Sequence, residues 1–175
     1  MRLRNHGQVA VIDLPEGWVE KPAETMRTTI GTRSLREFHQ PDEPEACICF
    51  YYRGLPLTTV GAAAFRTTLH QPEHLLSAKE IESLSEVLKE RVDPWVFVIE
   101  SARTLDWNGR RVLRLEGQYR ETGANLIEIF VDCDGTGRAV QEIYFIAPAG
   151  SFARYAQTAD KALRTIQWKS SQGSS

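Results

Sequence analysis

The feature that most constrains the fold is a series of four strand-like runs between residues 95 and 147, each ended by a turn signal. Asn108-Gly109 follows the first run, and this dipeptide readily supplies the two positive φ angles of a type I′ hairpin turn. Polar, glycine-containing segments at 121–125 and 134–137 separate the later runs. The sequence therefore predicts an antiparallel meander. Its four strands are Trp95–Asp106, Arg110–Arg120, Leu126–Cys133 and Arg138–Ala147.

Both faces of the last two strands carry apolar side chains, and a sheet that is apolar on both faces needs two covers. Helical periodicity predicts covers at Ser77–Val92, which opens with a Ser77/Glu80 capping box, and at Ser151–Trp168. A further helix is expected at Leu57–Leu69, although Gly61 and several threonines weaken it. We therefore expect helices packed on both faces of the sheet.

The N-terminal third adds strands, expected at Gln8–Leu14, Arg27–Phe38 and Glu45–Arg53. The predicted fold class is α+β, a three-layer sandwich whose antiparallel sheet has about six or seven strands with helices on both faces. We expect residues 1–169 to form a single domain and the polar segment 170–175 to be a flexible C-terminal tail.

Composition excludes several classes of function. A net charge of −2 and a pI near 6.1 provide no positive field for nucleic acid, so no nucleic-acid partner is expected. No run of about 18 apolar residues occurs and the N-terminus does not have the form of a signal peptide, so we expect no membrane insertion. The 3 cysteines are too few for a disulfide framework and suit a reducing, cytoplasmic location.

Cys47-x-Cys49 places two thiols on the same side of a predicted strand, where a soft metal ion or a redox partner could reach them. A metal site normally needs four ligands, and Cys133 alone does not supply a second pair. Structural burial is therefore the favoured interpretation, with a redox pair as the main alternative.

His70 and His74 have the spacing of two zinc ligands on one helix face, but Pro72 interrupts the helix that this would require. A connection between two helices is the favoured interpretation. Asp132–Gly137 is similar to the start of a calcium-binding loop, but the twelfth position is Ile143 where a bidentate glutamate is needed. A hairpin turn explains that segment better.

No nucleophile elbow, phosphate-binding loop or dinucleotide fingerprint occurs, so the sequence assigns no catalytic, cofactor-binding or metal-binding residue, and no cofactor. For two surfaces the sequence allows two interpretations each. The small-residue segment Leu55–Phe65 is expected to pack a helix on the sheet or, less favoured, to receive a partner. The arginines of the 110–120 hairpin suit a solvated edge or, less favoured, an acidic partner.

Three short motifs carry a resemblance: Leu14-Pro15-Glu16-Gly17-Trp18, Trp107-Asn108-Gly109-Arg110, and the ending Phe152-x-x-Tyr155 through Thr165–Lys169. With the order of the elements, they make the chain similar to the PsbP-like superfamily, which includes the Ran-binding Mog proteins and bacterial relatives. The resemblance implies a layered sheet flanked by helices and roles in binding a GTPase, a photosystem or a secretion effector. No binding residue of that superfamily can be matched to this sequence.

The leading hypothesis is a non-catalytic intracellular module that binds another protein, as an adaptor, a chaperone or an immunity-type protein. The alternative is a small-molecule- or metal-binding protein or enzyme with a pocket between sheet and helix. His70, His74, Asp132 and Asp134 are the residues to mutate in that case.

Overall fold

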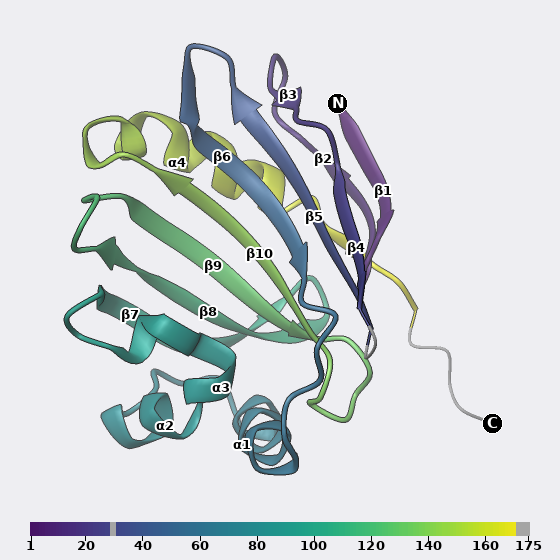
Figure 1. Ribbon diagram of the computed structural model, residues 1–175, viewed down its shortest axis with the longest axis vertical. Coiled ribbons are helices and arrows are strands. Elements are labelled where there is room, and N and C mark those ends of the chain that lie inside the picture. The colour runs from purple at the N-terminus through teal and green to yellow at the C-terminus, as the bar shows by residue number, and fades with distance from the viewer. Residues whose placement is uncertain (29–30, 171–175) are drawn as a thin grey trace.

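The computed structural model describes residues 1–28 and 31–170, and its centre is a curved antiparallel sheet of eight strands (Figure 1). The strands follow the order β3-β5-β6-β10-β9-β8-β7, with β4 paired to β5. Their bounds are β3 Val19–Glu20, β4 Glu24–Thr28, β5 Gly31–Gln40, β6 Glu43–Tyr52, β7 Phe97–Trp107, β8 Arg110–Tyr119, β9 Asn125–Asp132 and β10 Val140–Ala147.

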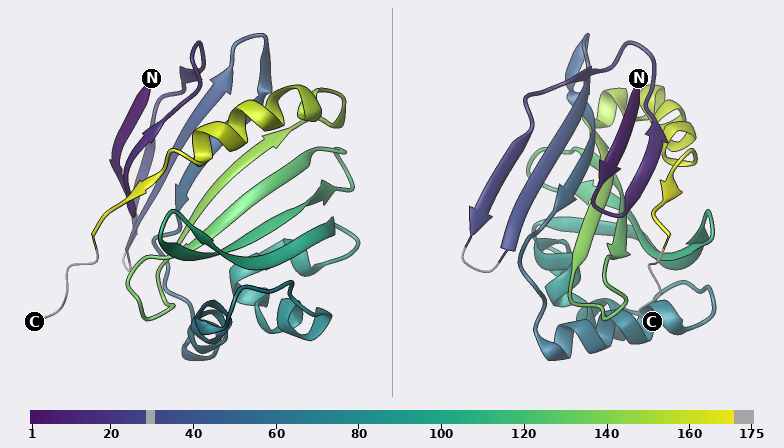
Figure 2. Two further views of the ribbon diagram at one scale, coloured as in Figure 1. Left: turned by 180° about the vertical axis from the view of Figure 1, so that it is seen from behind. Right: turned by 90° about the vertical axis from the view of Figure 1, so that its right-hand side faces the viewer.

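Two groups of elements pack against this sheet. Helix α4 (Ala149–Leu163) crosses one face next to a small sheet made of β1 (Arg2–His6), β2 (Val9–Asp13) and β11 (Gln167–Trp168), as Figure 2 shows. Helices α1 (Thr59–His70), α2 (Ala78–Ser83) and α3 (Ser85–Leu88) and the 3₁₀ turn η1 (Lys89–Val92) lie at the β7–β8 side of the sheet (Figure 1).

The buried apolar residues form two clusters, one on each face. The first cluster joins the sheet to α4 and the small sheet and includes Phe50, Ile129, Phe145 and Leu163. We call this side of the sheet the closed face. The second cluster joins α1, α3 and the loop before them to β7, β8 and β9, and it includes Phe65, Leu88, Leu115 and Phe130.

The part of this second side that lies over β5, β6 and β10 has no helix in front of it (Figure 1), and we call it the open face. The expectation of helices covering both faces as a three-layer sandwich is therefore not confirmed. The coarser prediction, an α+β fold on an antiparallel sheet, is confirmed. None of the helices among the described residues is long and apolar enough to cross a lipid bilayer.

The predicted meander is confirmed as β7 to β10, paired in sequence order. Asn108 and Gly109 have φ angles of 54° and 80°, as the hairpin turn between β7 and β8 requires. The predicted helix at 57–69 is α1, shifted by one or two residues. Of the predicted tail, residues 171–175 lie outside the described residues.

Three element predictions were wrong, and a fourth element, the strand at Gln8–Leu14, was predicted correctly but lies in a different sheet. The single strand at 27–38 is divided into β4 and β5, which pair antiparallel with Thr28 opposite Gly31, and residues 29–30 lie outside the described residues. The strand at Gln8–Leu14 joins the small sheet, so the main sheet reaches eight strands only through the short β3 and β4. The helix at 151–168 ends at Leu163, because Gln167–Trp168 pairs with β2.

The helix predicted at Ser77–Val92 is broken into α2, α3 and η1. Its capping box is confirmed, since Ser77 and Glu80 bond each other's backbone N–H groups. The break has a local cause, because Lys89 adopts a φ of 54° and Arg53 donates to the carbonyl oxygens of Glu86 and Val87. Tertiary hydrogen bonds here replace the continuation of the helix.

Candidate functional site

Polar side chains form a row across the open face. In the strand register Glu37 lies opposite Cys49, Cys49 opposite Tyr144, and Tyr144 opposite Glu128. Residues that lie directly opposite in an antiparallel sheet share a face. A carboxylate, a thiol, a phenol and a second carboxylate therefore stand side by side on β5, β6, β10 and β9.

A second row runs beside the first and contains His39, Cys47, Ile146 and Leu126 in the same strand order. Four potential metal ligands lie at one end of the two rows, on β5 and β6, and three of them, Glu37, Cys47 and Cys49, are close together. At the other end of the rows, β10 and β9 carry Tyr144 and Glu128 in the first row and Ile146 and Leu126 in the second.

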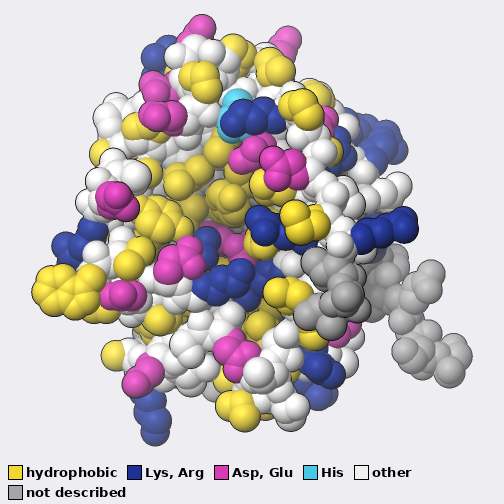
Figure 3. Space-filling view, in the orientation of Figure 1, with side chains coloured by type: hydrophobic (Ala, Val, Ile, Leu, Met, Phe, Trp, Pro, Cys, Tyr) yellow, Lys and Arg dark blue, Asp and Glu magenta, His cyan; other side chains and the backbone are white. Residues whose placement is uncertain are grey.

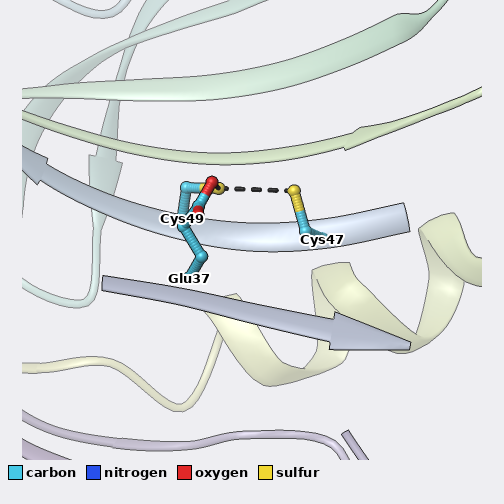
Figure 4. Close-up of side chains that lie close together, drawn as sticks. All are labelled: Glu37, Cys47 and Cys49. Atoms are coloured by element: carbon cyan, nitrogen blue, oxygen red, sulfur yellow. Dashed lines mark hydrogen bonds between the residues drawn. The ribbon is translucent and has the colours of Figure 1, made fainter. Parts of the chain in front are cut away.

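The two thiols are the closest pair in these rows. Cys47 Sγ and Cys49 Sγ, joined by the dashed line in Figure 4, are 3.4 Å apart, and both residues are buried. A carboxylate oxygen of Glu37 and both sulphurs lie within 4.8 Å of one another, and no other group of three such ligands occurs within residues 1–28 and 31–170. The hydrogen bond to Cys47, together with burial, holds the pKa of the Cys49 thiol well above its ordinary value. The Cys49 thiol is therefore uncharged without a bound cation.

His39 is the fourth polar residue at this end of the rows. Its side chain is buried, and Nδ1 is hydrogen bonded to the carbonyl oxygen of Pro44, so Nδ1 carries the proton and donates it. Nε2 is then the ring nitrogen with a free lone pair. It lies 3.8 Å from Glu37 Oε2 and has no hydrogen-bond partner in the described part of the chain.

A hollow of about 350 Å³ opens over these residues. Its walls include the half-buried side chains of Tyr119, Tyr144 and Ile146, and Cys47 and Cys49 line it as well. The space-filling view shows hydrophobic side chains gathered in a depression on this side of the molecule (Figure 3). A hollow of this size can hold a small ligand or a side chain of another protein.

Burial governs the two phenols of the hollow. It raises the pKa of Tyr119 to about 12 and raises the pKa of Tyr144 further above its ordinary value. Both phenols are therefore neutral at physiological pH, and each can donate a hydrogen bond to a ligand in the hollow.

Beneath the hollow lies a buried cluster of charged residues. Arg91 Nε is 2.8 Å from Glu128 Oε2 and its Nη2 is 3.7 Å from Glu142 Oε2, while Arg53 forms a second ion pair with Glu142. Burial raises the pKa of Glu128 well above its ordinary value, and Arg91 only partly opposes this effect. Because Arg91 belongs to η1 and Arg53 binds the α3 backbone, the cluster ties the helical segment to β9 and β10.

Of the residues that the sequence singled out, only Cys47 and Cys49 belong to this site. Their predicted position on one side of a strand is confirmed. His70 is the last residue of α1, whereas His74 binds Glu80 at 2.8 Å through Nε2 and the Pro72 carbonyl through Nδ1. The connection predicted around Pro72 is therefore confirmed.

The predicted turn at Asp132–Gly137 is also confirmed. The Asp132 carboxylate accepts hydrogen bonds from the N–H groups of Gly135 and Gly137, and Asp134 accepts one from Thr136. These carboxylate oxygens stabilise the turn between β9 and β10. Cys133, in the same turn, has its pKa raised to about 12 by burial and lies apart from the other two cysteines.

The sequence allowed two interpretations each for the small-residue segment and for the hairpin arginines. Ala62 and Phe65 of α1 are buried in the second cluster, which agrees with the packing interpretation of the small-residue segment. The hairpin arginines are spread over separate contacts, since Arg110 binds the Asp132 carbonyl and Arg120 the Pro94 carbonyl. Arg114 pairs with Glu116 and Asp160. They do not form one anion-binding patch.

Sequence reasoning missed Glu37, His39, Tyr144, Glu128 and Arg91. These residues come from separate strands and a turn, so no local spacing links them. One signal was present: Glu128 stands inside the apolar run Leu126–Val131, where a charged residue has to be paired or functional.

Comparison with known proteins agrees on the fold and gives no family. No protein-family model and no curated protein sequence matches the chain. Among solved structures, the chain is similar to the PsbP protein CyanoP from Synechocystis sp. PCC 6803, with a TM-score of 0.54 and 11% identity over 97% of this chain and 92% of that one.

Two further structures have lower scores. One is a protein of unknown function from Pseudomonas aeruginosa, with a TM-score of 0.48 and 12% identity over 95% of each chain. The other is a protein from Bacteroides thetaiotaomicron, with a TM-score of 0.47 and 16% identity over 96% of this chain and 48% of that one. The chain therefore has a PsbP-like fold, as its motifs and element order predicted.

Proposed function

We propose that this chain is a non-catalytic, intracellular module that holds an apolar segment of another protein against the open face of its main sheet. The observation that carries the proposal is the hollow on that face, whose walls are half-exposed aromatic and aliphatic side chains with no helix over them. Protein interfaces are enriched in tyrosine around such apolar depressions, where a side chain of the partner can be buried.

The edge of the sheet gives a second support. Trp95, just before edge strand β7, is 86% exposed, and Val96 and Val98 are each 37% exposed. Residues 74–76 bond the outer edge of β7 only near Ala102–Thr104, so Val98 lies on an uncovered part of the edge in the described structure. An exposed tryptophan beside an uncovered strand edge is unusual for a surface without a partner.

The proposed intracellular location rests on the free cysteines. Cys47 and Cys49 are adjacent, reduced and free, which suits a reducing compartment. The PsbP-like fold adds only an architecture, because one fold serves many unrelated functions.

The test compares the wild-type chain with two single variants as bait in a lysate of the source cells. Ile146→Arg places a charge in the wall of the hollow, and Val60→Arg places the same charge on an exposed position of α1, 78% accessible. We expect a stoichiometric partner that wild type and Val60→Arg retain and that Ile146→Arg loses. Circular dichroism and thermal unfolding check that both variants are folded.

Two results contradict the proposal. The first is the absence of any stoichiometric partner for the folded wild-type chain. The second is a partner that Ile146→Arg binds as well as wild type does, since this would place the interface elsewhere on the molecule.

A further inference from the structure

The sulphur atoms of Cys47 and Cys49 have a separation that a single metal ion can bridge. Zinc–thiolate bonds are about 2.3 Å long, and a tetrahedral ion holds two sulphurs roughly 3.8 Å apart. The observed separation of 3.4 Å needs only a slight widening. The sequence-level argument against a metal at this pair was the lack of further ligands along the chain, and the neighbouring strand supplies them.

Glu37 is the third ligand. Its Oε1 lies 3.9 Å from Cys49 Sγ because Glu37 is directly opposite Cys49 on β5. Among the described residues, Lys21 is the only lysine or arginine paired with this carboxylate, at 4.0 Å, and the Lys21 side chain is more than half exposed. Such an ion pair is weak and screened by water, so it does not hold Glu37 away from a divalent cation.

His39 is the independent indication of a site. It lies outside the group of three ligand atoms within 4.8 Å of one another, so it becomes the fourth ligand only when its side chain turns toward the ion. Its side chain is only 9% exposed, and Nε2 has no hydrogen-bond partner among the described residues although it faces Glu37. The bond from Nδ1 to the Pro44 carbonyl is the outer contact that metal-binding histidines usually make, because it fixes the tautomer and directs Nε2 at the ion. A buried, unpartnered imidazole nitrogen is otherwise costly.

An entry path is present. The two cysteines and Glu37 line the hollow on the open face, so an ion can reach them from solvent without unfolding of β5 or β6. The ligands lie on two central, hydrogen-bonded strands, which hold their backbone positions fixed.

We propose that Glu37, His39, Cys47 and Cys49 form a binding site for a thiophilic divalent ion of the zinc class. The two sulphurs, one nitrogen and one oxygen are all donor types that zinc accepts, and their number suits tetrahedral coordination. The proposal does not depend on a protein partner, and the site can hold its ion whether or not the hollow also receives one.

The test uses cobalt(II) as a spectroscopic probe for the reduced, metal-free full chain, followed by displacement with zinc. We expect one equivalent of cobalt to give the intense near-ultraviolet absorption of thiolate ligation, and zinc to remove it. Cys47→Ser and Cys49→Ser should abolish the absorption, while Cys133→Ser, the matched control outside the site, should leave it unchanged. Glu37→Gln and His39→Ala should weaken zinc binding by about tenfold or more.

A second measurement on the wild-type chain removes any dependence on the folding of the variants. Bound zinc should slow the alkylation of Cys47 and Cys49, read by mass spectrometry of peptides, and should leave the rate at Cys133 unchanged. The proposal fails if cobalt gives no thiolate band and zinc gives no protection. It also fails if the band persists in both cysteine variants or is lost in Cys133→Ser.

Discussion

The two sides of the main sheet are built from the same strands and differ in what covers them. On the closed face, Phe50, Ile129 and Phe145 meet α4 and the small sheet in a continuous apolar core. On the open face, the alternate residues of these strands include Cys49, Glu128 and Tyr144, and part of the surface has no helix over it.

The difference shows where buried polar groups lower the stability of the fold. Burying a carboxylate or an imidazole without full hydrogen bonding lowers stability, so a fold selected only for stability would place apolar residues there. The closed face follows that rule except at the hydrogen-bonded pair of His6 and Gln141, whereas the open face departs from it at Glu37, His39 and Glu128. The departures coincide with the hollow, and for this reason we place both proposals on the open face.

The largest expected effect compares adjacent residues of β10 that point to opposite faces. Phe145 is fully buried and stacks on Phe152, so Phe145→Ala should lower the free energy of unfolding by about 3–5 kcal/mol through lost burial and a cavity. Ile146 is half-buried at the hollow, and Ile146→Ala should cost about 1 kcal/mol. Urea unfolding measures both, and equal losses would contradict the division into a closed and an open face.

The second effect concerns the buried charges. Arg91→Met leaves Glu128 and Glu142 with less compensation and should lower the free energy of unfolding by about 3 kcal/mol. Adding Glu128→Gln to this variant removes the buried carboxyl group that has lost its partner and should restore about half of the loss. Unfolding of the single and double variants in urea measures the coupling, and additive losses would show that Arg91 acts by packing alone.

The sequence predicts features that depend on neighbouring residues and misses those that depend on residues far apart in the chain. Asn108-Gly109 and the Ser77/Glu80 capping box are local, and both occur as predicted. The division of 77–92 into three short elements was missed because its cause is distant: Arg53, from the end of β6, bonds the α3 carbonyls. Likewise β11 exists only because β2 is beside it.

The candidate site was predictable only in part. The pattern Cys47-x-Cys49 indicates a shared face, and this is correct. Glu37 and His39 become neighbours of these thiols through the register of β5 with β6, and that register includes a shift between His39 and Gln40. A one-residue change in pairing would turn both side chains to the closed face, so residue spacing alone could not identify them.

The third effect is a pH dependence on the closed side of the sheet. Burial lowers the pKa of His6 to about 4, with smaller contributions from Arg36 and Lys169. The unfolded chain binds this proton near pH 6.5, so the unfolded state holds more protons between these values and stability falls as the pH decreases from about 6.5 to 4. The expected loss from this group is about 2–3 kcal/mol.

Urea unfolding at pH 7 and pH 4.5 measures this loss, and His6→Gln isolates it from the titration of carboxylates. The variant should lose less stability than wild type over the same interval. An identical loss in both proteins would show that His6 does not carry the acid sensitivity of the closed side.

The smallest effect belongs to a half-exposed pair, His74 and Glu80, that lies on neither face. Hydrogen bonds to the Pro72 carbonyl and to Glu80 raise the pKa of His74, and bonds from Ser77 and His74 lower the pKa of Glu80 to about 2. Glu80→Gln should lower the pKa of His74 only part of the way to its ordinary value, because the Pro72 bond remains. Nuclear magnetic resonance titration of the imidazole measures this, with the nearby Glu82→Gln as the control that should leave His74 unchanged.

Because the pKa of His74 is raised, its stabilisation is present at low pH and is lost as the pH rises through the raised value. Water screens the pair, so the effect on unfolding should be far smaller than that of Arg91→Met, and a comparable loss would mean that exposure does not separate the two ion pairs.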